Sequence, residues 1–205
     1  MKFAVVGYSG SGKSTLAVRL GEMAGVPVLH LDKVQFLPGW EVRDQEESRA
    51  MVEEFLDQNQ NGGWVIDGNY SNFHYDCRMG EADLIFFLNF PRRICLPQAL
   101  YRNWKYKGKS RESIAEGCDE KMDLEFLWWI LYTGRSGRHR RRNLELLERY
   151  PGKVIELHNH RETERSLKFL AERLRRGPAG GQPSQSHESP EAPQGILLAE
   201  SEESI

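Results

Sequence analysis

The chain has 205 residues, 39% of them hydrophobic and 28% charged, which fits one globular domain with a buried core. No run of about 18 apolar residues is present to cross a bilayer, so we expect no membrane partner, and the three cysteines lack the spacing of a disulfide framework or a metal site. The apolar stretch after Met1 is too short for a signal-peptide core, which predicts a cytoplasmic protein.

Short β-branched or aromatic runs alternate with longer helical stretches, a pattern that predicts a parallel sheet covered by helices. The expected strands are 2–6, 26–31, 64–67, 83–89 and 153–157. The expected helices are 13–24, 44–59, 92–104, 120–133, 139–149 and 162–175. The fold class is therefore α/β. Because 105–142 contains helical patterns and no strand, we interpret it as an insertion outside the sheet.

The composition changes after Arg176. Residues 177–205 are rich in Gly, Pro, Ser and Glu and carry little apolar surface to offset the entropy of ordering. They hold five glutamates and no Lys, Arg or Asp, so the net charge of −2 leaves +3 on residues 1–176. We expect one domain over 1–176 and a disordered acidic tail over 177–205, although the apolar patch 196–198 could dock on a partner.

Residues 7–14 read GYSGSGKS, which matches the phosphate-binding pattern G-x-x-x-x-G-K-[ST] directly between an apolar strand and a helical pattern. Glycines let backbone N–H groups converge on phosphate oxygens, and the helix N-terminus adds partial positive charge. Lys13 is expected to reach the β- and γ-phosphates of ATP, and the Ser14 hydroxyl to bind Mg²⁺. The expected nucleotide-binding residues are Gly7, Ser9, Gly10, Ser11, Gly12, Lys13, Ser14 and Thr15.

Two aspartates stand at the ends of expected strands, where ligands bind in parallel sheets. Asp32 ends the second strand and Asp67 the third. We assign Asp32 to the acceptor, whose hydroxyl it would orient or deprotonate, and Asp67 to the metal. The alternative is that each caps a turn, since Asp67-Gly68-Asn69 is turn-forming by itself. His30, inside the same apolar strand pattern, is expected to be a hydrogen-bonded core histidine.

The segment 135–142 contains five arginines in eight residues. If it is helical, Arg135, Arg138 and Arg142 share one face. Closing such a face over the γ-phosphate would exclude water and stabilise the charge of the transition state, so we interpret these three residues as a lid. A solvated charged helix is the alternative, and such a cluster could also bind nucleic acid.

Several motifs occur together in one order: GYSGSGKSTLA, VLHLDKVQFLPGW, WVIDGNYS, DLIFFLNFPR and GRSGRHRRR. Together they resemble the bacterial DNA topology modulation proteins, often called FlaR-related, which are adenylate-kinase-like P-loop kinases. The resemblance covers about residues 1–172. It implies a P-loop NTPase fold with a five-stranded parallel sheet of order 2-3-1-4-5, an acceptor-binding region near 33–62 and a helical lid near 105–142.

The resemblance departs from adenylate kinases after Asp67-Gly68. Adenylate kinases continue with Phe-Pro-Arg, whereas Asn69-Tyr70-Ser71 follows in this sequence. The arginine that grips the acceptor's phosphate is therefore absent from its usual place, although Arg78 or the pair 92–93 could substitute. This difference argues against AMP as the acceptor.

Three functions follow from these observations. The first is an ATP- and Mg²⁺-dependent kinase that phosphorylates a nucleotide or another small molecule. The second is a nucleic-acid-associated protein with a regulatory ATP site, in which DNA is the partner; a pI near 6.3 argues against it. The third is an ATP-binding interaction protein without turnover.

Overall fold

The computed structural model describes residues 1–106, 113–115, 117–118 and 124–176. Five strands form one sheet: β1 (Lys2–Gly7), β2 (Val28–His30), β3 (Trp64–Asp67), β4 (Leu84–Leu88) and β5 (Val154–Leu157). All neighbouring strands are parallel, and their order is β2-β3-β1-β4-β5. The expected fold class and strand order are confirmed.

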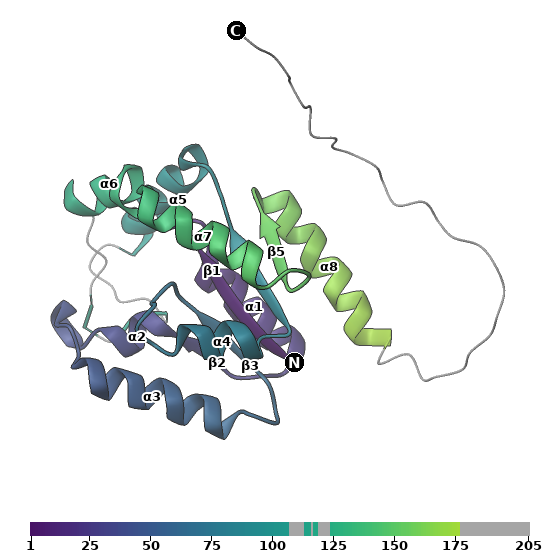
Figure 1. Ribbon diagram of the computed structural model, residues 1–205. Helices are drawn as coiled ribbons and strands as arrows, with labels where there is room; N and C mark the ends of the chain where they lie inside the picture. The colour runs from purple at the N-terminus through teal and green to yellow at the C-terminus, as the bar shows by residue number, and fades with distance from the viewer. Residues whose placement is uncertain (107–112, 116, 119–123, 177–205) are drawn as a thin grey trace, which may run out of the picture.

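Helices cover both faces of the sheet (Figure 1). The α-helices are α1 (Lys13–Ala24), α2 (Leu31–Gln35), α3 (Gln45–Gln58), α4 (Tyr75–Glu81), α5 (Arg92–Lys105), α6 (Leu124–Leu131), α7 (Gly137–Arg149) and α8 (His160–Arg176). Two short 3₁₀ helices are η1 (Pro38–Trp40) and η2 (Thr133–Arg135). The described residues between β4 and β5 contain helices and no strand, as expected for 105–142. The segments 107–112 and 119–123 of that region, and the expected tail 177–205, lie outside the described residues.

The alternation of side chains along β1 divides the core into two layers. Phe3 and Val5 point to the face covered by α1, α5 and α8, together with Phe86 and Leu88 of β4. Ala4 and Val6 point to the opposite face, which is covered by α2, α3, α4 and α7. The central strand is therefore buried on both sides, and the loop that follows it is held between two helical layers.

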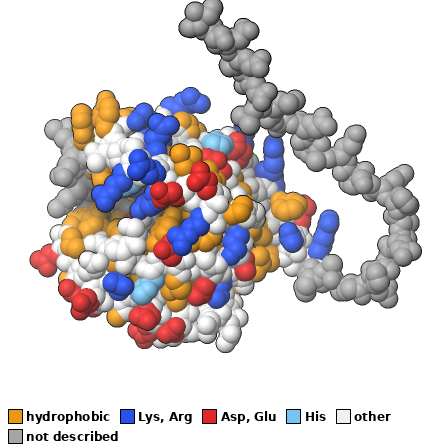
Figure 2. All heavy atoms as spheres, in the orientation of Figure 1, with side chains coloured by type: hydrophobic (Ala, Val, Ile, Leu, Met, Phe, Trp, Pro, Cys, Tyr) orange, Lys and Arg blue, Asp and Glu red, His pale blue; other side chains and the backbone are white. Residues whose placement is uncertain are grey.

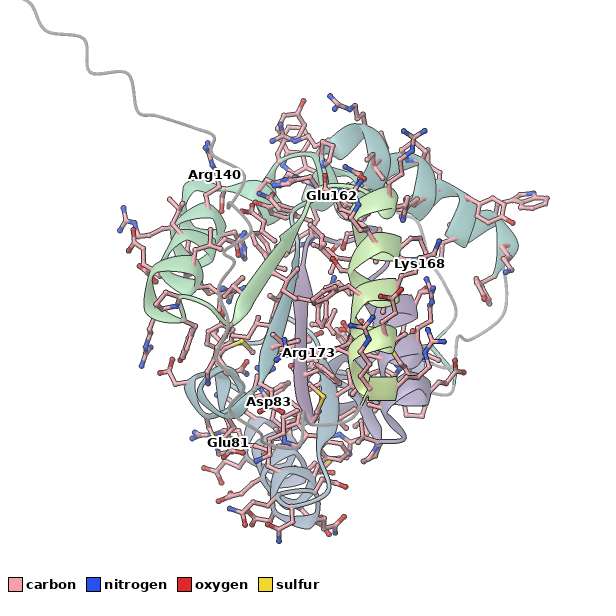
Figure 3. The ribbon with its side chains drawn as sticks, turned by 90° about the vertical axis from the view of Figure 1, so that its right-hand side faces the viewer. Glu81, Asp83, Arg140, Glu162, Lys168 and Arg173 are labelled. Atoms are coloured by element: carbon pink, nitrogen blue, oxygen red, sulfur yellow. The ribbon has the colours of Figure 1, made fainter. Side chains whose placement is uncertain are left out.

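The carboxyl ends of the strands meet at one edge of the sheet. Glu162, in the first turn of α8, marks this end in Figure 3, and Glu81 and Asp83 mark the opposite end. At that opposite end the backbone N–H of Lys2 donates to Asp83 (2.7 Å) and its ammonium pairs with Glu81 (2.8 Å). No helix in the described part of the chain is both long and apolar enough to cross a membrane.

Two helices were not predicted from the sequence. Helix α2 follows β2 without an intervening loop, so β2 ends at His30 and the expected strand 26–31 is too long. The reason is that Leu31 and Val34 are both buried in the core layer that contains Ala4 and Val6. Residues three apart lie on the same face of a helix but on opposite faces of a strand, so both can be buried in one layer only if the segment is helical. The other, α4, begins after His74, which has left-handed backbone angles (φ 47°).

Candidate nucleotide-binding site

The phosphate-binding loop links β1 directly to α1. Gly7 ends β1 beside Leu88 of β4, and a Cβ at Gly7 would lie 2.5 Å from the Leu88 carbonyl oxygen. Gly12 has φ 90°, a left-handed conformation that favours glycine, and immediately precedes Lys13, the first residue of α1. The N–H groups of the first helical turn have no partner within the helix and are available to an anion.

The side chains of the loop differ in exposure. Lys13 is half-buried and donates from Nζ to the carbonyl oxygen of Tyr8 (3.2 Å), so its ammonium is folded back over the loop. Ser9 and Ser14 are half-buried, Thr15 is exposed and Ser11 is 1% exposed. The helix N-terminus and the ammonium together provide a site for a polyphosphate.

Asp67 and His30 form a buried pair at the carboxyl edge of the sheet. The parallel register of β2 and β3 places the two residues side by side, and His30 Nδ1 lies 3.0 Å from Asp67 Oδ2. Both side chains are more than nine-tenths buried. The expectation that His30 is a hydrogen-bonded core histidine agrees with this contact. The second oxygen of Asp67, Oδ1, is buried and has no hydrogen-bond partner among the described residues.

Asp32 lies in the first turn of α2, not at the end of a strand as predicted. Its Oδ1 accepts a hydrogen bond from the hydroxyl of Tyr70 (2.8 Å), which stands three residues after Asp67. Burial, followed by the charges of Asp32 and Asp67, raises the pKa of Tyr70 well above its ordinary value. The tyrosine therefore stays protonated and donates, and the charges of both aspartates lie close enough to act on its hydroxyl.

Asn69 joins β3 to the phosphate-binding loop, a role that sequence reasoning missed. The backbone N–H of Gly7 donates to Asn69 Oδ1 (3.0 Å), and Asn69 Nδ2 donates to the Gly7 carbonyl oxygen (2.6 Å). One side-chain amide thus satisfies both backbone groups of the first glycine. For Asn69 itself, the sequence indicated only a place in the turn that follows Asp67.

Arg78 holds the loop that contains Tyr70. This arginine is completely buried, and it donates from Nε to the Phe73 carbonyl (2.6 Å) and from a terminal nitrogen to the Tyr70 carbonyl (2.6 Å). Burial lowers the pKa of Arg78 to about 10. Its two carbonyl contacts make it a structural support of the 70–73 loop.

Arg135 lies against the phosphate-binding loop. Its guanidinium stacks over the Tyr8 ring, 3.7 Å from the centroid, and it donates to the Phe90 carbonyl oxygen (2.6 Å). The neighbouring helix α7 adds a contact, because Asn143 Nδ2 donates to the Tyr8 hydroxyl (3.2 Å). Burial lowers the pKa of Arg135 from its ordinary value. Tyr8, Asn143 and Arg135 therefore join the arginine-rich segment to the site.

The three expected lid arginines do not share a helix face. Arg135 ends η2, and Ser136 has extended backbone angles (φ −60°, ψ 164°) that separate η2 from α7. Arg138 and Arg142 lie one turn apart on α7, where Arg138 is exposed. Arg142 lies 5.7 Å from the centroid of the Tyr75 ring and lines a cavity of about 240 Å³ between α4 and α7. The prediction of one common face was wrong because the helix begins only at Gly137.

Comparisons with known proteins concern the fold. No protein-family model matches the chain, and no curated protein matches its sequence. Its structure is similar to that of deoxyadenosine kinase from M. mycoides with bound dATP (TM-score 0.51, 13% identity, 85% of this chain and 100% of that chain covered). The chain has a P-loop NTPase fold.

Two further structures show weaker likeness. Shikimate kinase from Bacteroides thetaiotaomicron has a TM-score of 0.46 at 17% identity, with 85% of this chain and 98% of that chain covered. A gluconokinase from Sinorhizobium meliloti 1021 has a TM-score of 0.43 at 18% identity, with 85% and 95% covered.

Proposed function

We propose that this protein binds ATP with Mg²⁺ at residues 7–15 and transfers the γ-phosphate to a small acceptor that carries a hydroxyl group. The proposal is based on the arrangement of charged groups at the carboxyl edge of the sheet. Lys13 and the N-terminus of α1 face the carboxyl edge of the sheet, where Asp67 ends β3 and Asp32 follows β2. A polyphosphate cradle beside two carboxylates has the groups that phosphoryl transfer needs.

Magnesium fits the oxygen atoms that the site offers. Mg²⁺ takes oxygen ligands and is usually held by one or two protein groups together with substrate phosphates and water. Ser14 supplies a hydroxyl at the start of α1, and the unpartnered, buried Oδ1 of Asp67 supplies a carboxylate oxygen that lacks any hydrogen bond from the described residues. Ser14 and Asp67 would hold the ion, directly or through water. When bound, Mg²⁺ offsets the negative charge that develops on the phosphates during transfer.

Asp32 is assigned to the acceptor. The acceptor oxygen forms a bond to the γ-phosphorus while the bond from that phosphorus to the β–γ bridging oxygen breaks, and ADP leaves. Asp32 orients the acceptor hydroxyl and accepts its proton. The acceptor would lie against residues near 33–62, and the segment 105–142 would act as the lid, with Arg135 nearest to the phosphates. The deoxyadenosine kinase with a similar fold makes nucleosides reasonable first candidates.

Calorimetric titration with Mg·ATP tests the first half of this proposal. Lys13→Ala should raise the Kd about 10- to 100-fold, since hydrogen bonds to charged groups contribute about 1.5–3 kcal/mol. Lys168→Ala is the matched control, because Lys168 projects from α8 on the surface (Figure 3) and should leave the Kd unchanged. Equal affinity of wild type and Lys13→Ala would sink the assignment.

A screen of acceptors tests the second half. Wild-type protein is incubated with γ-labelled ATP, Mg²⁺ and a panel of nucleosides, nucleoside monophosphates and sugar acids, and label transfer is measured. Transfer to one class identifies the acceptor. ATP binding without any transfer would favour an interaction protein that lacks turnover.

The outer surface of α7 favours one second candidate, a nucleic-acid-binding protein with a regulatory ATP site. Arg138, Arg140 and Arg141 are exposed, and the described residues place no carboxylate within ion-pair distance of them. Arg140 points away from the body of the protein in Figure 3. In the view of Figure 2, Lys and Arg side chains lie over α7 beside acidic ones, and further acidic side chains line the side of α3. Such a surface could contact phosphates of DNA.

A further inference from the structure

Tyr70 and Asn69 are adjacent in the chain, yet their side chains contact opposite halves of the site. Asn69 holds both backbone groups of Gly7 in the phosphate-binding loop, whereas Tyr70 donates to Asp32 on the acceptor side. The position of the Asp32 carboxylate relative to the cradle is therefore linked through two consecutive residues. Phosphoryl transfer requires the distance between the acceptor-binding carboxylate and the phosphates to be fixed closely, because small misplacements of reacting groups lower the rate by large factors.

The Tyr70 ring is fixed on several sides. It stacks on Phe73 with 5.1 Å between ring centroids and an interplanar angle of 25°. The backbone carbonyl oxygen of Tyr70 accepts a hydrogen bond from the buried guanidinium of Arg78 (2.6 Å), which fixes the backbone of this loop. The hydroxyl consequently has a defined direction, and that direction leads to Asp32.

The chemistry of the pair fixes which atom donates. An ionised carboxylate can only accept hydrogen bonds, and the raised pKa of Tyr70 keeps the phenol protonated. Oδ1 of Asp32 is occupied by this bond, and in the described part of the chain no group donates to Oδ2. The carboxylate thus keeps one oxygen for an incoming hydroxyl group.

We propose that Tyr70 is a positioning residue, which acts through Asp32 by holding its carboxylate so that Oδ2 faces the acceptor, at a distance from the phosphates set by the Asn69–Gly7 contact. This inference rests on the proposed function. It predicts that the tyrosine hydroxyl affects transfer only while Asp32 is a carboxylate, whereas a merely structural hydroxyl would act independently of Asp32.

A double-mutant cycle of Tyr70→Phe and Asp32→Asn tests the proposal. Tyr70→Phe keeps the ring stacked on Phe73 and removes only the hydroxyl. With the best acceptor of the panel, it should lower kcat about 10-fold, the loss expected for one hydrogen bond to a charged group, and leave the Kd of Mg·ATP within about 2-fold. In the Asp32→Asn background the same change should alter kcat less than about 2-fold.

Tyr150→Phe is the control, because Tyr150 directly follows α7 and, among the described residues, its hydroxyl donates only to the Asp76 carbonyl oxygen (3.4 Å). It should keep the wild-type kcat, and urea unfolding of every variant identifies any loss of stability. A wild-type kcat for Tyr70→Phe, or an equal loss with and without the Asp32 carboxylate, overturns this inference and leaves the proposed function standing. A wild-type protein that transfers phosphate to no acceptor overturns both.

Discussion

The guanidinium of Arg135 stacks on the ring of Tyr8, the second residue of the phosphate-binding loop, at 3.7 Å. The carbonyl oxygen of the same tyrosine accepts from Lys13 Nζ, the ammonium assigned to the phosphates. One residue of the loop therefore contacts both the arginine-rich segment and the phosphate-binding lysine. Any movement of Arg135 changes the surroundings of Lys13, which links the expected lid to the cradle.

Arg135→Ala is expected to slow transfer more than it weakens ATP binding, because contacts that strengthen as a site closes stabilise the transition state more than the ground state. We expect kcat to fall about 10-fold or more, which corresponds to about 1.4 kcal/mol or more of lost transition-state stabilisation. Arg138→Ala is the matched control, since this arginine is exposed on the next helix. Equal kcat values for the two variants would contradict a lid role for Arg135. Steady-state kinetics with a separate ATP titration measures both effects.

Replacing Arg138, Arg140 and Arg141 together by Ala separates the enzyme from the nucleic-acid binder. For a kinase, turnover should not change, and DNA affinity of the wild type should be no better than the roughly 10⁻⁴ to 10⁻⁶ M of non-specific binding at physiological salt. Fluorescence anisotropy with a labelled duplex at several salt concentrations gives this value.

A DNA-binding protein would give a different result in the same experiment. If these arginines clamp DNA, the wild type should bind tightly with a steep salt dependence, and the triple variant should reduce the slope of log K against log salt by up to about three. The double change of Lys168 and Arg173 to Ala, on the face of α8 shown in Figure 3, should leave that slope alone. Such a result would promote the nucleic-acid function over the kinase.

Gly10→Ala should destabilise the protein and weaken ATP binding. Gly10 has φ 77°, and a Cβ there would overlap the carbonyl oxygen of Cys95. Strain at a left-handed position together with this overlap is expected to lower the free energy of unfolding by about 1–3 kcal/mol. Gly62→Ala is the control, because its Cβ would meet no atom within 4 Å and its φ is not in the left-handed region. Urea unfolding compares the two variants, and similar midpoints would show that the loop tolerates a side chain.

Removal of residues 177–205 should leave the thermal midpoint and the Kd of Mg·ATP unchanged. Their composition offers little apolar surface to a core, and the five described strands and the residues of both described core layers lie within residues 1–176. Differential scanning calorimetry of the shortened chain measures the midpoint. For a domain of this size, about 1 kcal/mol of lost stability lowers the midpoint by roughly 2–4 °C. A fall of several degrees would therefore show that the segment packs on the domain.

The sheet and the phosphate-binding loop could be predicted because their signals are local. A buried parallel strand such as Leu84–Leu88 is a continuous apolar run, and residues 7–14 carry the loop chemistry in consecutive positions. Helix α2 escaped prediction because its five residues follow the strand without a turn signal, so Leu31 was assigned to the expected strand 26–31.

The hydrogen bonds that hold the site together could not be predicted, because the residues that form them are far apart in the chain. Asn69 meets Gly7 across 62 residues, and Tyr70 meets Asp32 across 38. The Asn69–Gly7 contact depends on the register that aligns Val5 with Asp67, and the Tyr70–Asp32 contact depends on the register that aligns His30 with Asp67. No local pattern in the sequence specifies either register. Likewise, the expectation of one arginine face assumed a continuous helix, and the break at Ser136 depends on how η2 meets α5 and the phosphate-binding loop.

The contacts of Gly7 also bear on the order of folding. Residues 7–14 are synthesised before Asn69 and Leu88 and contain the whole motif, but the backbone N–H of Gly7 is held by Asn69 and Gly7 lies against Leu88 of β4. Closing these long loops has an entropic cost that is offset only when β3 and β4 join β1. A nascent chain that ends before Leu88 would thus carry the complete motif without its native cradle, and nucleotide would begin to stabilise the domain only after Leu88 has emerged.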